Sequence, residues 1–171
     1  MRKTSMMLSL ALALAAVPAF AQNESWATTI RSLQEVPALD TPAGGTFVAT
    51  LNEAGTEISW ELKYVRFAGD VTQAHIHFAQ QGVNGGIMVF FCSNLGNGPA
   101  GTQACPPSPG VVRGTWQADD VVAGAAAQGI PAGDFRGLLR SLRTGISYVN
   151  VHTTLFPGGE ARGQVAQRLT N

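Results

Sequence analysis

The chain has 171 residues, a length that suits a single domain, and its 11 Lys and Arg balance 11 Asp and Glu to a formal net charge of zero. No run of basic residues interrupts this balance. Nucleic acid and anionic membrane surfaces are therefore poor candidates as partners.

Residues 1–21 have the pattern of a cleavable secretory signal peptide. Two basic residues precede an apolar run from Met6 to Val17, and Ala19-Phe20-Ala21 forms a small-x-small cleavage site. The apolar run is too short to cross a bilayer core of about 30 Å. We therefore predict cleavage before Gln22, one mature domain over residues 22–171 without a transmembrane segment, and export to the periplasm or the extracellular space.

Most of the mature chain alternates apolar and polar side chains with a period of two, which is typical of half-buried β-strands. Residues 57–64 show this best, because every second side chain from Ile58 to Tyr64 is apolar. They are expected to form a hairpin with residues 46–51 across a Gly-containing turn. The complete set of expected strands covers residues 26–33, 46–51, 57–64, 71–78, 87–91, 111–116, 146–153 and 160–169.

Helical periodicity is confined to a short segment near the C-terminal end. Apolar residues recur at i, i+3, i+4 and i+7 from Phe135 to Leu142, which predicts a helix over 134–143 that Gly133 or Asp134 caps and Gly145 ends. A shorter helix could begin at the acidic segment 118–122. The predicted fold class is all-β, an antiparallel Greek-key-like sandwich or open barrel with one or two short helices.

The chain has two cysteines, Cys92 and Cys105. An exported protein meets an oxidising compartment, so we predict that they form a disulfide. The closed loop, residues 93–104, is rich in Gly and Asn and lacks apolar periodicity. Cross-linking a loop of this size stabilises the fold by roughly 3 kcal/mol in the chain-entropy model. A redox-active pair is the less favoured interpretation, because such pairs usually lie closer together in sequence.

Four stretches resemble the CHRD (chordin-type) domain, namely Leu33–Pro37, Ala74–Phe78 with Gly82–Gly85, Tyr148–Thr153, and Pro157–Gln164. The third of them, Tyr-Val-Asn-Val-His-Thr, matches the family pattern outright. The resemblance extends from about Trp26 to Leu169, with Ala79 and Ala161 as departures from the usual residues and the disulfide loop as a local elaboration.

The resemblance implies an all-β fold and an extracytoplasmic location more firmly than it implies a function. The family is named after repeats of chordin, an extracellular protein that binds growth factors, and it also occurs in exported bacterial proteins. We therefore expect a non-enzymatic binding or structural module, with an extracytoplasmic protein or a small ligand as its partner. The sequence has no nucleophile elbow, P-loop or dinucleotide-binding glycine pattern, so no catalytic residue is assigned.

All three histidines of the chain lie in the resembling stretches. His75 and His77 are two residues apart on one expected strand and so share a face. On a second strand His152 shares a face with Asn150, and on a third strand Glu160, Arg162 and Gln164 share one. If the three strands are neighbours, these polar side chains form one cluster on the face opposite the core.

Two interpretations of this cluster remain open. In the first it is a hydrogen-bonded network, in which Asn150, Glu160, Arg162, Gln164 and Glu35 supply the partners of the histidines. In the second interpretation the three histidines bind one Cu or Zn ion, and those polar residues orient the rings by hydrogen bonds to the ring nitrogens that do not bind the ion. Three histidines are too few for the two-metal site of a copper-zinc dismutase.

Overall fold

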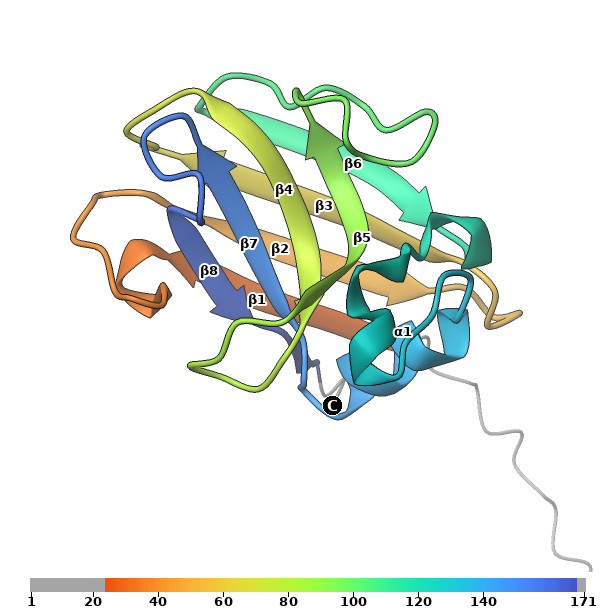
Figure 1. Cartoon of the computed structure of the whole chain (residues 1–171). Helices are drawn as coiled ribbons and strands as arrows, with labels where there is room; N and C mark the ends of the chain where they lie inside the picture. Colours follow the sequence, from red (N-terminus) through yellow and green to blue (C-terminus); the bar gives the residue numbers. More distant parts are fainter. Residues whose placement is uncertain (1–23, 169–171) are drawn as a thin grey trace, which may run out of the picture.

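The computed structural model describes residues 24–168, so the predicted signal peptide lies outside the described residues. Within them the chain forms nine strands and four short helical segments (Figure 1). The strands are β1 Ser25–Arg31, β2 Gly44–Leu51, β3 Ile58–Val65, β4 Val71–Phe78, β5 Gly86–Ser93, β6 Gly110–Trp116, β7 Tyr148–Thr153, β8 Ala161–Gln164 and β9 Ala166–Gln167. The helical segments are the 3-10 turns η1 Ser32–Gln34, η2 Ala118–Asp120 and η3 Ala123–Gln128, and the α-helix α1 Phe135–Arg143.

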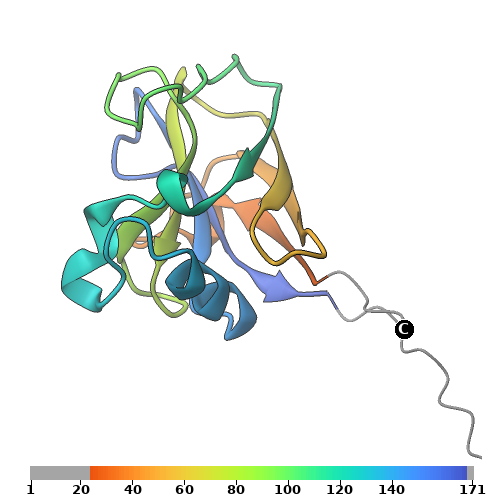
Figure 2. The same cartoon turned by 90° about the vertical axis from the view of Figure 1, so that its right-hand side faces the viewer.

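The strands form one antiparallel sheet in the order β5-β4-β7-β8-β1-β2-β3-β6, with β9 paired to β1. The sheet curls into a nearly closed barrel, in which the half β5-β4-β7-β8 lies in front of the half β1-β2-β3-β6 (Figure 1). The all-β prediction with short helices is thus confirmed. The helical segments η2, η3 and α1 gather at one end of this barrel, whereas η1 lies at the opposite end of β1 (Figure 1 and Figure 2).

The predicted strands appear with small changes at their ends. The first strand ends at Arg31, two residues earlier than predicted, because the 3-10 turn η1 begins at Ser32. The last one is divided: β8 pairs with β7, whereas β9 pairs with β1. Between them Val165 is buried, and its amide donates to the carbonyl of Ser147. The strand is divided because the chain pairs with β7 up to Gln164 and with β1 from Ala166 onward.

The expected hairpin is formed by β2 and β3, which pair from Leu51↔Ile58 to Gly44↔Val65. Its turn is held by Asn52, whose side-chain oxygen accepts the amides of Thr56 at 2.9 Å and Glu57 at 3.2 Å. Side-chain capping of this kind is the physical reason that Asn is favoured in turns. The turn fixes the register and so directs the alternate apolar side chains of both strands inward.

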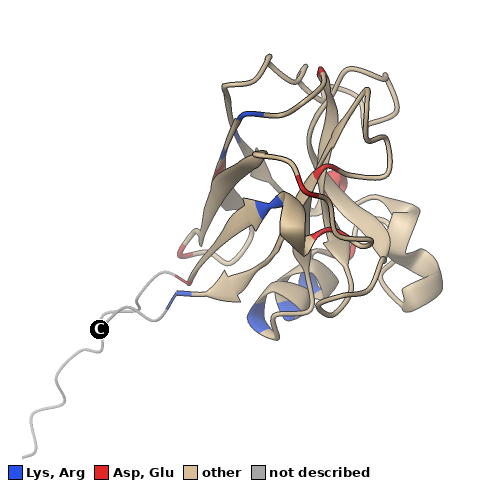
Figure 3. Cartoon of the chain, turned by 90° about the vertical axis from the view of Figure 1, so that its left-hand side faces the viewer, with Lys and Arg blue, Asp and Glu red and all other residues tan. Residues whose placement is uncertain are grey.

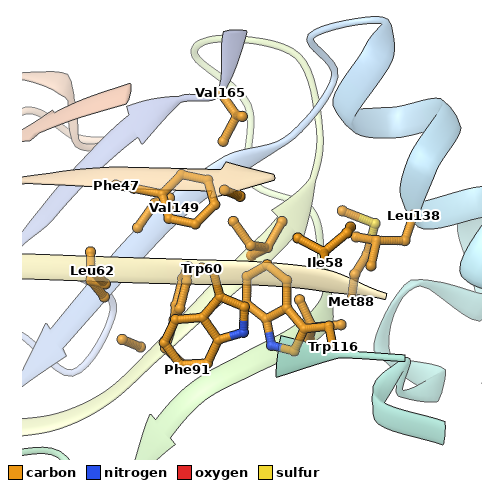
Figure 4. Packing of buried hydrophobic residues seen from close by; sticks show 14 of the residues in the cluster. Phe47, Ile58, Trp60, Leu62, Met88, Phe91, Trp116, Leu138, Val149 and Val165 are labelled. Carbon is orange, nitrogen blue, oxygen red and sulfur yellow. The ribbon is translucent and has the colours of Figure 1, made fainter. Parts of the chain in front are cut away.

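The core lies between the two halves of the barrel and is centred on aromatic rings (Figure 4). Trp60 stacks on Trp116 with 5.1 Å between ring centroids, and Phe91 meets Trp60 edge-on at 5.0 Å. Phe47 meets Phe91 in the same manner at 5.4 Å. These rings come from β2, β3, β5 and β6, so one aromatic group joins strands of both halves.

The barrel is left open between β5 and β6, and side chains bridge this seam. The indole of Trp116 donates to the carbonyl of Phe90 at 2.8 Å, and Gln103 donates to carbonyls of both strands. The predicted disulfide between Cys92 and Cys105 is confirmed and ties the loop after β5 to the end of that strand.

Helix α1 ends at Arg143 as predicted and begins at Phe135, one residue later than predicted. The carboxylate of Asp134 caps it by accepting the amide of Gly137 at 2.8 Å. After the helix Gly145 has a φ of 68°, a left-handed conformation that favours glycine at this position. The buried face carries Leu138 next to Met88 at one end of the core (Figure 4). The second predicted helix is the 3-10 turn η2.

Basic and acidic residues are scattered along the chain, and α1 carries several of the basic positions coloured blue in Figure 3. Within residues 24–168, no helix has the length and apolar character that a membrane span requires.

Candidate metal centre

The three histidines come together on two neighbouring strands. His75 and His77 lie on β4 and His152 lies on β7, which is antiparallel to β4 with His75 opposite Asn150 and Gln73 opposite His152. Ala74, Ile76, Val149 and Val151, the alternate residues of both strands, belong to the core. The histidines therefore project from the outer face of the barrel wall, as the period-two pattern indicates.

His75, His77 and His152, which we call the histidine cluster, each offer one nitrogen, and these three atoms lie within 4.8 Å of one another. The ring centroids are 5.0 Å apart for His75 and His152 and 5.4 Å apart for His75 and His77. Metal–nitrogen distances of about 2.0–2.1 Å require donor atoms about 3.4 Å apart. The largest of the three separations would have to shorten by up to about 1.4 Å to reach this value.

Two backbone carbonyls fix the orientation of two rings. Nδ1 of His77 lies 2.9 Å from the carbonyl oxygen of Gly85, and Nδ1 of His152 lies 2.9 Å from that of Pro157. A carbonyl oxygen only accepts, so each Nδ1 must carry the proton. In the neutral ring the Nε2 atom then presents a free lone pair. This arrangement is the usual outer support of a metal-binding histidine.

The remaining nitrogens of the histidine cluster are buried without hydrogen-bond partners. Among atoms of the described residues, neither nitrogen of His75 has a partner, and Nε2 of His77 and of His152 also lacks one. As whole residues, His75 is 0% exposed, His77 8% and His152 6%. A buried polar atom without a partner costs about 1–3 kcal/mol, so such a group calls for an explanation.

Burial keeps the three rings neutral. It lowers the pKa of His75 to about 2, and the proximity of His152 and His77 lowers this pKa further. It lowers the pKa of His77 to about 4, although the hydrogen bond to Gly85 opposes this. The pKa of His152 is lowered for the same reason. Neutral imidazole is the form that coordinates metal ions, so no proton has to be displaced at pH 7.

Aromatic rings enclose the histidine cluster on two sides. The ring of Phe90 on β5 meets His75 edge-on with 4.4 Å between centroids. Tyr148 on β7 stacks on His77 at 4.9 Å and is nearly parallel to it, at 6°. The guanidinium carbon of Arg162 lies 4.5 Å from the centroid of the Tyr148 ring. One continuous stack therefore runs from Arg162 through Tyr148 to His77.

A buried polar network lies beside the histidine cluster. Nε of Arg162 donates to Glu35 at 2.8 Å, and Asn150 donates to the other oxygen of that carboxylate. Arg162 also donates to the side chain of Asn84 at 2.7 Å. Burial raises the pKa of Glu35, and Arg162 opposes the change. This network holds η1 and the β4–β5 loop against β7 and β8.

Two of the candidate polar residues point elsewhere. Glu160 accepts from the amide of Ala68 at 2.9 Å and from the hydroxyl of Thr153 at 2.8 Å. Gln164 donates to the carbonyls of Ala79 and Gly145. Glu160 and Gln164 therefore hold loops in place. The side chains of the polar network form hydrogen bonds among themselves and not with the histidines. His77 and His152 donate instead to backbone carbonyls.

The sequence analysis missed several residues of the site. Tyr148 shares a face with Asn150 and His152, so the period-two pattern could have placed it. Phe90 lies in a continuous apolar run, which does not tell the inner from the outer face. The carbonyls of Gly85 and Pro157 have no side-chain signal, because their placement depends on the path of two loops.

Comparison with known families gives one result. The family model of the CHRD domain matches residues 26–165, which include every residue of the histidine cluster and of the polar network. No curated protein matches the chain.

Proposed function

The chain belongs to the CHRD family, and we propose that it is an exported binding module that holds one copper or zinc ion through His75, His77 and His152. The observation that carries this proposal is the convergence of buried ring nitrogens that have no partner within the described residues. One ion at their centre would satisfy a lone pair on each ring. Imidazole nitrogen suits both copper and zinc.

The energetic balance supports a ligand over a metal-free network. A polar network stabilises a fold only when its hydrogen bonds are satisfied. The nitrogens that face the centre of the histidine cluster form no hydrogen bond within residues 24–168. Three such atoms at about 1–3 kcal/mol each are a large fraction of the stability of a domain. A fold tolerates such a cost most readily at a functional site.

Export is the second part of the proposal. Its support is the signal-peptide pattern of residues 1–21, the disulfide between Cys92 and Cys105, and family membership. A disulfide persists in the periplasm or outside the cell, whereas cytosolic thiols are kept reduced. The proposed activity is binding, with the CHRD fold as a scaffold for the histidine cluster.

Metal uptake by the purified protein tests the proposal. Chelator-stripped protein is titrated with Zn(II), with Cu(II) and, without oxygen, with Cu(I), and bound metal is counted after desalting. We expect one ion per chain for at least one of these metals, and loss of uptake in His75→Ala and in His152→Ala.

The matched control is Gln73→Ala. Gln73 precedes His75 on the same face of β4, and its side chain accepts from Asn97. This variant should bind metal as the unaltered protein does, and circular dichroism should show that all variants are folded. Absence of saturable uptake of every one of the metals would refute the proposal, as would uptake that survives the loss of His75 and His152 together.

A further inference from the structure

The donor set of the histidine cluster lacks any negative charge. Within the described residues, the group that could hold an ion consists of the three histidines alone. Both cysteines of the chain are in the disulfide, so no thiolate is available. The Glu35 carboxylate is bound by Arg162 and Asn150, and the Glu160 carboxylate is bound by Ala68 and Thr153. An ion bound here would keep its full charge.

The surroundings disfavour a high charge. The idealised free energy of moving an ion out of water grows with the square of its charge. This cost is therefore about four times larger for a divalent ion than for a monovalent ion of similar size. The guanidinium of Arg162 lies over Tyr148, which stacks on His77. This positive group repels a second cation, and the repulsion doubles when the ion is divalent.

The site also restricts access of water to the ion. The unpartnered nitrogens are buried, His75 packs against Phe90, and His77 packs against Tyr148. A zinc ion held by three protein ligands completes its tetrahedron with water, and Cu(II) prefers a tetragonal set of donors. Monovalent copper is a d¹⁰ ion that three nitrogen donors can satisfy without a further ligand.

We infer that the histidine cluster selects monovalent copper over Zn(II) and Cu(II). The inference rests on the proposed function, and it names the ion that the site is built to hold. In an oxidising compartment thiolates are lost to disulfides, whereas imidazoles persist as donors. Preferential binding of the reduced ion must also raise the reduction potential of the bound copper, because the potential reports the ratio of the two affinities.

The affinities of the full-length mature protein for the three ions test the inference. Cu(I) is measured without oxygen against bicinchoninate, Cu(II) against nitrilotriacetate, and Zn(II) against a fluorescent chelator. We expect Cu(I) to bind at least a thousandfold more tightly than either divalent ion. The reduction potential of the copper-loaded protein should lie above that of copper in an imidazole solution.

His152→Ala should reduce the Cu(I) affinity by at least a hundredfold, and Gln73→Ala should leave it unchanged. Tight, histidine-dependent binding of Zn(II) or Cu(II) that equals or exceeds that of Cu(I) would overturn the inference and leave the proposed metal site standing. If none of the ions binds, the proposed function fails together with the inference.

Discussion

Replacement of His75 by Phe separates a ligand site from a hydrogen-bonded network. The ring of His75 is fully buried, meets Phe90 edge-on and has no hydrogen-bond partner within the described residues at either nitrogen. A phenyl ring can keep the contact with Phe90 and removes two buried polar atoms that cost about 1–3 kcal/mol each. The larger ring adds an overpacking cost of about 1–3 kcal/mol. Removing two such atoms outweighs the overpacking cost over most of these ranges, so we expect the free energy of unfolding of the metal-free variant to lie between about 1 kcal/mol below and about 5 kcal/mol above that of the original.

Asn150→Leu provides the contrast on the neighbouring strand. Asn150 is also buried, but its amide donates to Glu35 and to the carbonyl of Ala161. Its loss leaves the Glu35 carboxylate with one partner fewer and should cost about 2–4 kcal/mol. For a domain of this size such a loss lowers the unfolding midpoint by about 4–16 °C.

Urea unfolding of the metal-free proteins, followed by tryptophan fluorescence, measures both changes. His75→Phe should unfold near or above the midpoint of the original protein and should no longer take up metal. If His75→Phe is as destabilising as Asn150→Leu, the nitrogens of His75 have partners in the folded protein, and the network interpretation is correct.

Three further predictions concern acid, reduction and export. Burial lowers the pKa of His75 to about 2 and of His77 to about 4, so below pH 6.5 the unfolded chain binds more protons than the folded one. The free energy of unfolding of the metal-free protein should therefore fall between pH 6.5 and 4, and less so in His75→Phe; equal falls in both proteins would contradict this. Unreduced, denatured protein should show no free thiol, and reduction of Cys92–Cys105 should cost roughly 3 kcal/mol in urea unfolding; two titratable thiols before reduction would refute the pairing in the exported protein. The intact mass of the exported protein should equal that of residues 22–171, and a mass that includes residues 1–21 would show that the leader is retained.

The period-two pattern predicts most of what positions the histidine cluster. It places His75 and His77 opposite the core residue Ile76, and His152 opposite Val151, because alternate side chains of a strand face opposite ways. That β4 and β7 are neighbours is a matter of topology, which the pattern alone leaves open.

The hydrogen bonds around the histidine cluster could not be predicted in the same way. Glu160 shares a face with Arg162 in the pattern, yet its carboxylate turns to Ala68 and Thr153 because two loops bring their donors to it. The carbonyls of Gly85 and Pro157 reach the rings because of the paths of the β4–β5 and β7–β8 loops. Such contacts depend on loop geometry, for which residue type is a weak guide.

X-ray absorption of the copper-loaded protein tests the central claim most directly, because it reports the donors of the ion itself. Protein loaded with one equivalent of Cu(I) should show three nitrogen donors with the outer-shell scattering of imidazole, and His152→Ala treated with the same copper should lose this three-nitrogen signature. A spectrum with oxygen or sulfur donors, or one that is unchanged in His152→Ala, would show that the copper binds elsewhere and that His75, His77 and His152 are not its ligands.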